Sequence, residues 1–281
     1  MKHEVAVVIG VGGMGQSIAR RIGSGTQLLI ADVDEKHVGA VATQLEEEGY
    51  EVASAVIDVS SAGPVAALAQ QAASLGSVRA VVHTAGLSPI QAPVKAILAV
   101  DLLGVALVLE EFAEVIAPGG AGVVIASMAG ALRPPFPPEV ARQLATTPAS
   151  ELLALPVASA DQFTNGSQAY GFAKRANQVR VQAASVAWGA RGARINSVSP
   201  GTIATPMNAA ELDGEHGELM RMMVDASNAG RLGTPNEISA AVEFLLSPAA
   251  AFISGTDLLV DGGVTAAFQA GALDALQAAL G

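Results

Sequence analysis

The stretch "VVIGVGGMGQSIAR", residues 7–20, joins a short apolar run to a helical pattern through a cluster of glycines. Three of these glycines have the spacing Gly10-x-Gly12-x-x-Gly15. Such glycines allow a tight turn, a close approach of the backbone to a pyrophosphate and close packing of a helix on a strand. The stretch therefore predicts a dinucleotide-binding unit, with a flexible glycine turn as the alternative.

Apolar runs and helical patterns alternate along the rest of the chain. The runs expected to form strands are 4–9, 27–32, 51–59, 78–86, 121–127, 193–201 and 256–263. The patterns expected to form helices are 14–23, 34–49, 62–76, 96–109, 167–189 and 235–247. Such alternation with continuously apolar strands is typical of a parallel sheet covered on both faces. We expect an α/β fold of the Rossmann type, a doubly wound parallel sheet of about seven strands in a single domain over residues 1–281.

Residues 131–166 break this alternation, because six of the 14 prolines lie there. These prolines exclude one continuous helix or a central strand. We expect an inserted, mostly irregular lid or subunit contact within the domain. Two interpretations stay open: a cover that shapes the substrate pocket, and a surface elaboration away from it.

The composition narrows the class of protein. A net charge of −11 disfavours nucleic acid as a partner, because an acidic chain repels phosphate backbones. The absence of cysteine excludes disulfides and thiolate chemistry, and the four histidines show no metal-binding spacing, so no metal site is expected. The most apolar long segment, 96–109, carries Asp101 and is too short to span a membrane. We expect a cytoplasmic protein without a membrane partner.

Asp32 ends the second expected strand, where an acid can bind the adenosine ribose hydroxyls of a dinucleotide. Its carboxylate would repel a 2′-phosphate, and Arg20 and Arg21 lie deeper in the first helix. The sequence therefore favours NAD over NADP as cofactor. A solvated aspartate at the end of a strand is the alternative.

Further motifs follow along the chain in a fixed order. They are Asp58-Val59, "HTAG" (83–86), Ser127 in "IASMAG", Tyr170-x-x-x-Lys174, "NSVSPGTIATPM" (196–207) and the C-terminal "GRLGTPNEISAAVEFLLS" with "ISGTDLLVDGG". With these motifs in this order, the chain resembles the short-chain dehydrogenase/reductase family over nearly its whole length. The resemblance implies cofactor contacts from Gly10, Gly12, Gly13, Met14, Gly15, Asp32, Asp58, Val59, Ala85, Gly86, Tyr170, Lys174, Pro200, Gly201, Ile203 and Thr205.

The resemblance also implies a catalytic set of Ser127, Tyr170 and Lys174. A free tyrosine, with a pKa of ~10, is a poor base at neutral pH, but an ammonium one helical turn away favours the phenolate. By resemblance, Lys174 also binds the nicotinamide ribose, Ser127 holds the substrate oxygen, and Tyr170 transfers the proton as hydride moves. The implied activity is NAD-dependent interconversion of a secondary alcohol and a ketone. The alternative is a protein that binds NAD for sensing or interaction with little turnover.

The substrate is expected to be small to medium and largely apolar. Methionines at 207, 220, 222 and 223 lie in the region where the family usually covers its substrate. Methionine side chains can form an adaptable apolar wall. They can equally belong to the core or to a subunit interface.

The chain departs from the family pattern in three places. By resemblance, the segment at 131–166 is an insertion between Ser127 and Tyr170, which lie much farther apart than in the family pattern. Its glycine loop, Gly10-x-x-Gly13-x-Gly15, is one residue shorter than the usual Gly-x-x-x-Gly-x-Gly, which leaves the role of each glycine open. Asp101 stands where the family usually has the asparagine of its catalytic tetrad. This acid either holds the relay water and pairs with Lys174, as a fourth catalytic residue, or is a buried structural group.

The assembly is also expected from the resemblance. The helices around 96–112 and 167–189 resemble the helices through which members of the family form dimers. We therefore expect a homodimer or homotetramer that binds a small alcohol or ketone.

Overall fold

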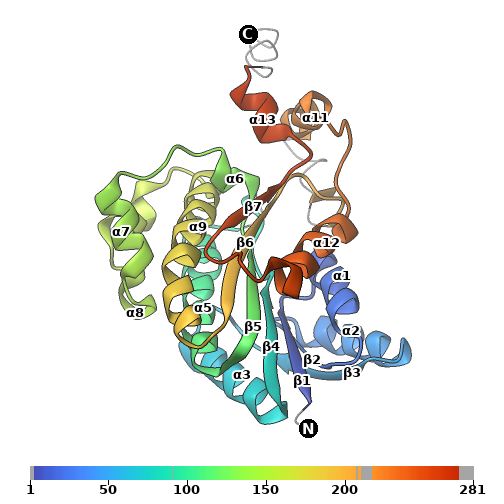
Figure 1. Ribbon diagram of the computed structural model, residues 1–281. Coiled ribbons are helices and arrows are strands. Elements are labelled where there is room, and N and C mark those ends of the chain that lie inside the picture. The colour runs from blue at the N-terminus through green and yellow to red at the C-terminus, as the bar shows by residue number, and fades with distance from the viewer. Residues whose placement is uncertain (1–2, 91, 207, 210–216, 272–281) are drawn as a thin grey trace.

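A computed structural model describes residues 3–90, 92–206, 208–209 and 217–271. Its strands are β1 (Glu4–Ile9), β2 (Gln27–Asp32), β3 (Glu51–Val56), β4 (Ser77–His83), β5 (Ile116–Ile125), β6 (Arg194–Pro200) and β7 (Asp257–Val260). All pair in parallel in the order β3-β2-β1-β4-β5-β6-β7 (Figure 1). The predicted α/β fold with a parallel sheet is confirmed. The main difference in strand bounds is at β5, which begins at Ile116 instead of residue 121.

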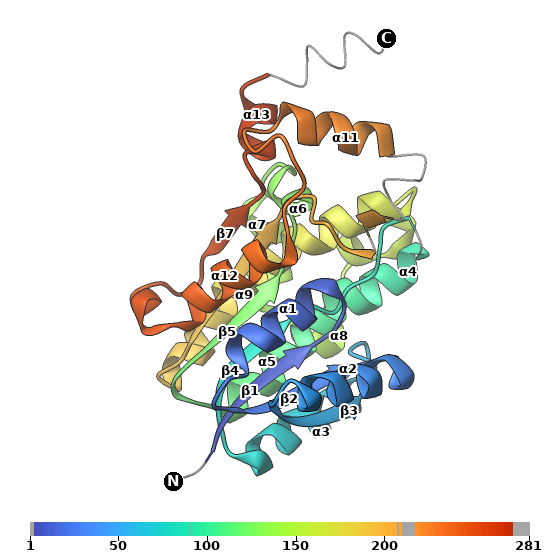
Figure 2. The ribbon, with the colours of Figure 1, turned by 90° about the vertical axis from the view of Figure 1, so that its right-hand side faces the viewer.

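Helices cover both faces of the sheet (Figures 1 and 2). One face carries α1 (Gly13–Ile22), α2 (Glu35–Glu47) and α12 (Pro235–Leu246), and the other carries α3 (Ala62–Leu75), α5 (Val105–Val115) and α9 (Gly166–Ala190). Because successive side chains of a strand point to opposite faces, Val7 and Leu29 enter the core under α3, α5 and α9, whereas Val8 and Ile30 enter the core under α1, α2 and α12. The remaining described helices include α11 (Gly217–Ala226), α13 (Val264–Gln269) and the 3₁₀ turn η4 (Pro248–Ala250).

The strand order places the switch point of the sheet between β1 and β4. The chain leaves β1 for β2 on one side and later returns to β4 on the other side of β1. Ligands of such open sheets bind in the crevice at the carboxyl ends of the strands, at the switch point. The glycine turn after β1 and the "HTAG" turn after β4 therefore meet at this edge.

The prediction that residues 131–166 are mostly irregular is wrong. The chain forms α6 (Met128–Ala131), α7 (Pro138–Thr146), α8 (Ala149–Leu152) and the 3₁₀ turns η2 (Pro156–Ala158) and η3 (Ala160–Gln162). The prolines stand where helices begin: Pro138 and Pro156 at first helical positions, and Pro148 just before α8. Proline is tolerated there, because the N–H that it lacks would have no intrahelical partner.

This segment packs on the outer side of α9 and α5 (Figure 1). The buried guanidinium of Arg180 on α9 donates to the carbonyl oxygens of Leu144, at 2.7 Å, and Thr147, at 3.0 Å. It also lies 3.2 Å from the carboxylate of Glu110 on α5. The chain itself therefore covers part of the two helices that were expected to join subunits, and the assembly stays a prediction.

The apolar stretch around 96–109 is not one regular helix. A short α4 (Val94–Ile97) continues into the π-helical turns η1 (Leu98–Gly104) and then into α5. Asp101 lies in these wider turns, and π-helical insertions are frequent at functional sites. Among the described helices, none has the length and apolar character that crossing a membrane requires.

Candidate active site

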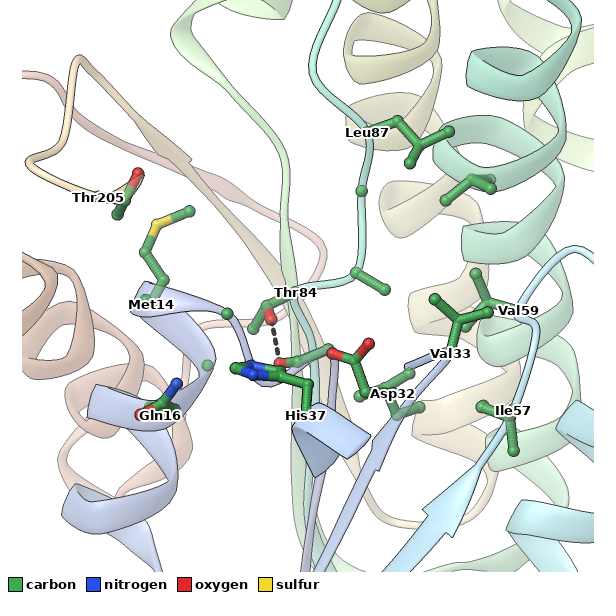
Figure 3. Close-up of a pocket in the computed structure, with 18 of the residues that line it drawn as sticks. Met14, Gln16, Asp32, Val33, His37, Ile57, Val59, Thr84, Leu87 and Thr205 are labelled. Carbon is green, nitrogen blue, oxygen red and sulfur yellow. Dashed lines mark hydrogen bonds between the residues drawn. The ribbon is translucent and has the colours of Figure 1, made fainter. Parts of the chain in front are cut away.

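A cavity of about 490 Å³ opens at the carboxyl ends of the strands, beside the start of α1 (Figure 3). The predicted cofactor residues that line it are Gly10, Gly12, Gly13, Met14, Gly15, Asp32, Asp58, Val59, Ala85, Gly86 and Thr205. Its other lining residues are Ile9, Gln16, Val33, His37, Ile57, Thr84, Leu87, Val100 and Pro206. The sequence prediction did not include these, of which Gln16, His37 and Thr84 bear polar groups that contact the glycine loop.

The geometry assigns a separate role to each glycine of the loop. Gly10 has a φ of 89°, and a Cβ there would overlap the backbone of Ala85. A Cβ at Gly15 would overlap the carbonyl oxygen of Gly10, so this glycine allows α1 to pack on the turn. A Cβ at Gly13 would lie 3.1 Å from the side chain of Thr205, whereas one at Gly12 would meet nothing within 4 Å. Gly12 therefore faces open space.

Asp32 is held in place at the edge of the cavity. Its Oδ2 accepts a hydrogen bond from the Val11 N–H at 2.9 Å, and its Oδ1 accepts one from the Asp34 N–H at 3.2 Å. Val33, next in the chain, is exposed and apolar. A fixed carboxylate here can accept from ribose hydroxyls and repels a phosphate.

Asp58 is held at the cavity wall, whereas the predicted cofactor residues Tyr170 and Lys174 are not among the described residues that line the cavity. The Asp58 carboxylate accepts from the N–H and hydroxyl of Ser60, at 2.9 and 2.7 Å, which fixes it at the cavity wall. Pro200, Gly201 and Ile203 do not line the cavity, and the last two line a neighbouring one of about 210 Å³.

These features fit a nicotinamide dinucleotide. The first N–H groups of α1 lack intrahelical acceptors and can bind a diphosphate. The Asp32 carboxylate can accept hydrogen bonds from a ribose. The apolar side chains of Ile57, Val59 and Val100 line the cavity wall, against which a flat base can pack.

Lys174 lies buried behind the cavity wall, with 4% of its surface exposed. Its ammonium Nζ is 3.2 Å from Oδ1 of Asp101, which is fully buried, and donates to the Ile125 carbonyl oxygen at 3.2 Å. A Cβ at Gly86 would lie 3.3 Å from Nζ, so this glycine of the cavity wall lies directly against the ion pair. The structure therefore brings Asp101 and Lys174 together, as one of the two interpretations of Asp101 requires.

Tyr170 lies next to this ion pair, and Ser127 follows the end of the strand whose Ile125 carbonyl oxygen accepts from Lys174. Nζ of Lys174 is 5.4 Å from the centre of the half-buried Tyr170 ring. Ser127 follows two residues after Ile125 and caps α6, its Oγ accepting from the Ala129 N–H at 3.1 Å. The turn after β5 thus supplies Ser127, and helix α9 supplies Tyr170 and Lys174.

The charges of the buried pair influence each other strongly. Burial raises the pKa of Asp101, and the Lys174 ammonium and the Leu87 N–H only partly oppose this. For Lys174, burial alone would lower the pKa, but the charges of Asp101 and Tyr170 and the hydrogen bond to Asp101 outweigh it, so its pKa is raised. Lys174 is therefore firmly cationic at neutral pH.

His83 is a buried titratable group whose environment the sequence did not reveal. It ends β4, in the "HTAG" turn, with 1% of its surface exposed. Burial and the nearby Lys174 ammonium lower its pKa to about 3. The ring is therefore neutral under ordinary conditions and adds no positive charge behind Lys174.

The segment 131–166 anchors the start of α9 without lining the cavity. The ring of Phe172, two residues after Tyr170, lies 5.4 Å from that of Phe136 and 5.0 Å from that of Phe163. The residues described as lining the cavity include none from this segment. They also include none of the methionines on α11, and Met207 lies outside the described residues.

Comparisons with known proteins agree with this geometry. A family model described as short chain dehydrogenase matches residues 4–138, and one described as enoyl-(acyl carrier protein) reductase matches residues 139–265. The chain is 40% identical to the short-chain dehydrogenase/reductase bsc3 of Alternaria brassicicola, over 95% of this chain and 97% of that protein. The chain belongs to the short-chain dehydrogenase/reductase family.

Two further relatives extend this result. The cis-4-hydroxycyclohexanecarboxylate dehydrogenase of Sinomonas cyclohexanicum is 31% identical over 94% of this chain and 97% of that protein. The crystal structure of levodione reductase superimposes with a TM-score of 0.76 at 25% identity and covers 94% of this chain and 98% of that chain. As a short-chain dehydrogenase/reductase, the protein is an oxidoreductase that uses a nicotinamide dinucleotide, NAD or NADP.

Proposed function

We propose that this short-chain dehydrogenase/reductase interconverts a secondary alcohol and a ketone with NAD as cofactor. The observation that carries the proposal is the Tyr170 ring beside the ammonium of Lys174, which Asp101 and the Ile125 carbonyl oxygen hold in place. The bound dinucleotide supplies the acceptor or donor of hydride. A protein that only binds NAD has no need of this arrangement.

Each side chain has a distinct task in the proposed reaction. The cationic Lys174 favours the Tyr170 phenolate, which takes the proton from the substrate hydroxyl during oxidation and returns it during reduction. The Ser127 hydroxyl accepts from Ala129, so its own proton is free for the substrate oxygen. The substrate carbon is then held in one orientation.

We further propose a small to medium, largely apolar substrate and a homodimer or homotetramer. The name of the cis-4-hydroxycyclohexanecarboxylate dehydrogenase supports an alcohol on a hydrocarbon ring. Reduction of NAD⁺ with a panel of cyclic and open-chain secondary alcohols, and oxidation of NADH with the matching ketones, tests the function. Tight binding of NAD⁺ without turnover of any of them would favour the alternative, a sensing or interaction protein, which the unusual Asp101 motivates.

Cofactor choice gives a first prediction. The unchanged protein should bind NAD⁺ more tightly than NADP⁺, because the fixed carboxylate of Asp32 accepts from ribose hydroxyls and repels a 2′-phosphate. In Asp32→Ala we expect the dissociation constant for NADP⁺ divided by that for NAD⁺ to fall about 10-fold, the value of one hydrogen bond to a charged group. Calorimetric titration with both cofactors measures it.

The matched control is Glu35→Gln, which removes one negative charge from an exposed position three residues away. Its ratio of dissociation constants should equal that of the unchanged protein. Tighter binding of NADP⁺ by the unchanged protein would refute the choice of NAD.

A further inference from the structure

Val11 in the shortened glycine loop makes contacts through its side chain, its N–H and its carbonyl oxygen, in addition to the hydrogen bond that Gly10 accepts from Thr84. Its side chain is fully buried in the core under α1, α2 and α12. Its N–H donates to Asp32 at 2.9 Å. Its carbonyl oxygen lies 3.0 Å from the amide nitrogen Nε2 of Gln16 and 2.9 Å from the ring nitrogen Nε2 of His37. The side chain, the N–H and the carbonyl oxygen of Val11 therefore each have a contact within the protein.

The contact with His37 has a defined direction. A carbonyl oxygen can only accept, so Nε2 of His37 must carry the proton, in the neutral as in the cationic ring. The His37 backbone is itself placed by the cap of α2, where the Asp34 carboxylate accepts from the His37 N–H at 3.0 Å. In Figure 3, His37 lies between Gln16 and Asp32 at the cavity.

Holding the Val11 carbonyl also orients the next N–H. In a planar trans peptide the C=O of one residue and the N–H of the next point in opposite directions. The N–H of Gly12 therefore points away from His37 and Gln16. Gly12 is the cap residue before α1, and the space beside it is open. An N–H in this position belongs to the set with which a helix start binds an anion.

We propose that His37, together with Gln16, is a positioning residue for the diphosphate of the dinucleotide. By donating to the Val11 carbonyl oxygen, the two side chains prevent this peptide from turning over and keep the Gly12 N–H directed at the diphosphate. The loop is one residue shorter than usual, and side chains from α1 and α2 fix it from outside. The inference rests on the proposed function, because it needs a dinucleotide in this cavity.

The test compares His37→Phe, which keeps a ring without a donor, with His37→Gln, whose amide can reach the same oxygen. Isothermal calorimetry with NAD⁺ and with ADP gives the dissociation constants. We expect His37→Phe to weaken both about 5-fold, within the range for one hydrogen bond, and His37→Gln to restore them to within about 2-fold. Adenosine, which has no phosphate, should bind all three proteins equally in a competition assay.

Two further measurements separate positioning from a loss of structure. Gln16→Leu removes the second donor to the same oxygen and should weaken the binding of NAD⁺ and ADP as His37→Phe does. This variant also tests the inference if His37→Phe fails to fold. In turnover, KM for NAD⁺ should rise with kcat unchanged. Lys36→Ala, at the exposed neighbouring position, should match the unchanged protein.

The outcomes are distinguishable. Unchanged affinity for NAD⁺ and ADP in both His37→Phe and Gln16→Leu, or equal losses in His37→Phe and His37→Gln, would overturn the inference alone. Equal weakening of adenosine would also overturn it, because the effect would then not involve the diphosphate. Failure of the unchanged protein to bind NAD⁺ would overturn the proposed function and this inference with it.

Discussion

Replacing Tyr170 with phenylalanine is expected to lower kcat at least ~10²-fold, the low end for the loss of a general acid or base. The substitution removes only the hydroxyl and keeps the ring that lies 5.4 Å from the Lys174 ammonium. The proton of the substrate hydroxyl then has no acceptor of suitable strength. Affinity for NAD⁺ should stay nearly unchanged, because Tyr170 is not among the residues that line the described cavity. Steady-state kinetics with the best alcohol of the panel, together with calorimetry, measure both quantities.

The chain contains a matched control, because it has only two tyrosines. The hydroxyl of the other one, Tyr50, donates to the Arg20 carbonyl oxygen at 2.9 Å, outside the cavity. Tyr50→Phe removes the same atom from the same kind of side chain and should leave kcat unchanged. Turnover near that of the unchanged protein in Tyr170→Phe would show that the tyrosine is misassigned.

The features that sequence reasoning predicted well are those set by neighbouring residues. The glycine turn after β1 and Asp32 at the end of β2 follow from local patterns, and the parallel sheet follows from their alternation. Both Gly10 and Asp32 line the cavity, and their contacts with a cofactor stay a prediction. Their positions depend on strand ends, which apolar periodicity locates to within a few residues.

The features that it missed depend on side chains meeting across long stretches of chain. His37 contacts Val11 across 26 positions, and nothing in the first turn of α2 indicates that partner. Residues 131–166 looked irregular because proline counts against helices, but prolines at helix starts are compatible with them. Burial of Arg180 under this segment is likewise a tertiary property.

Asp101→Asn should move the pH profile of alcohol oxidation to lower pH on both limbs. The amide has nearly the shape of the carboxylate but no charge. Loss of the negative charge favours the Tyr170 phenolate, so the acid limb moves down. The substitution also removes the Asp101 charge that raises the pKa of Lys174. Burial then has the larger effect and lowers this pKa. Lys174 then loses its proton at lower pH, and the alkaline limb moves down too.

The same substitution should reverse how stability changes with pH on the alkaline side. In the unchanged protein the pKa of Lys174 is raised above its ordinary value of 10.5, so the folded state binds more protons there and stability falls as pH rises through the raised pKa. In Asp101→Asn a lowered pKa leaves the unfolded state with more protons. Between this lowered pKa and 10.5, stability should therefore rise with pH. Urea unfolding across this range measures the sign of the slope.

Glu110→Gln is the control for these two readouts, because Glu110 also pairs with a buried cation, that of Arg180, but far from Tyr170 along α9. It should lower the free energy of unfolding and leave both limbs of the pH profile in place. If Asp101 were only a structural acid, Asp101→Asn would behave in the same way, with lower stability and an unshifted profile. A shift of both limbs in Asp101→Asn alone would place the carboxylate in the catalytic set, because only a group coupled to Lys174 can move the protonation of the lysine and the tyrosine together.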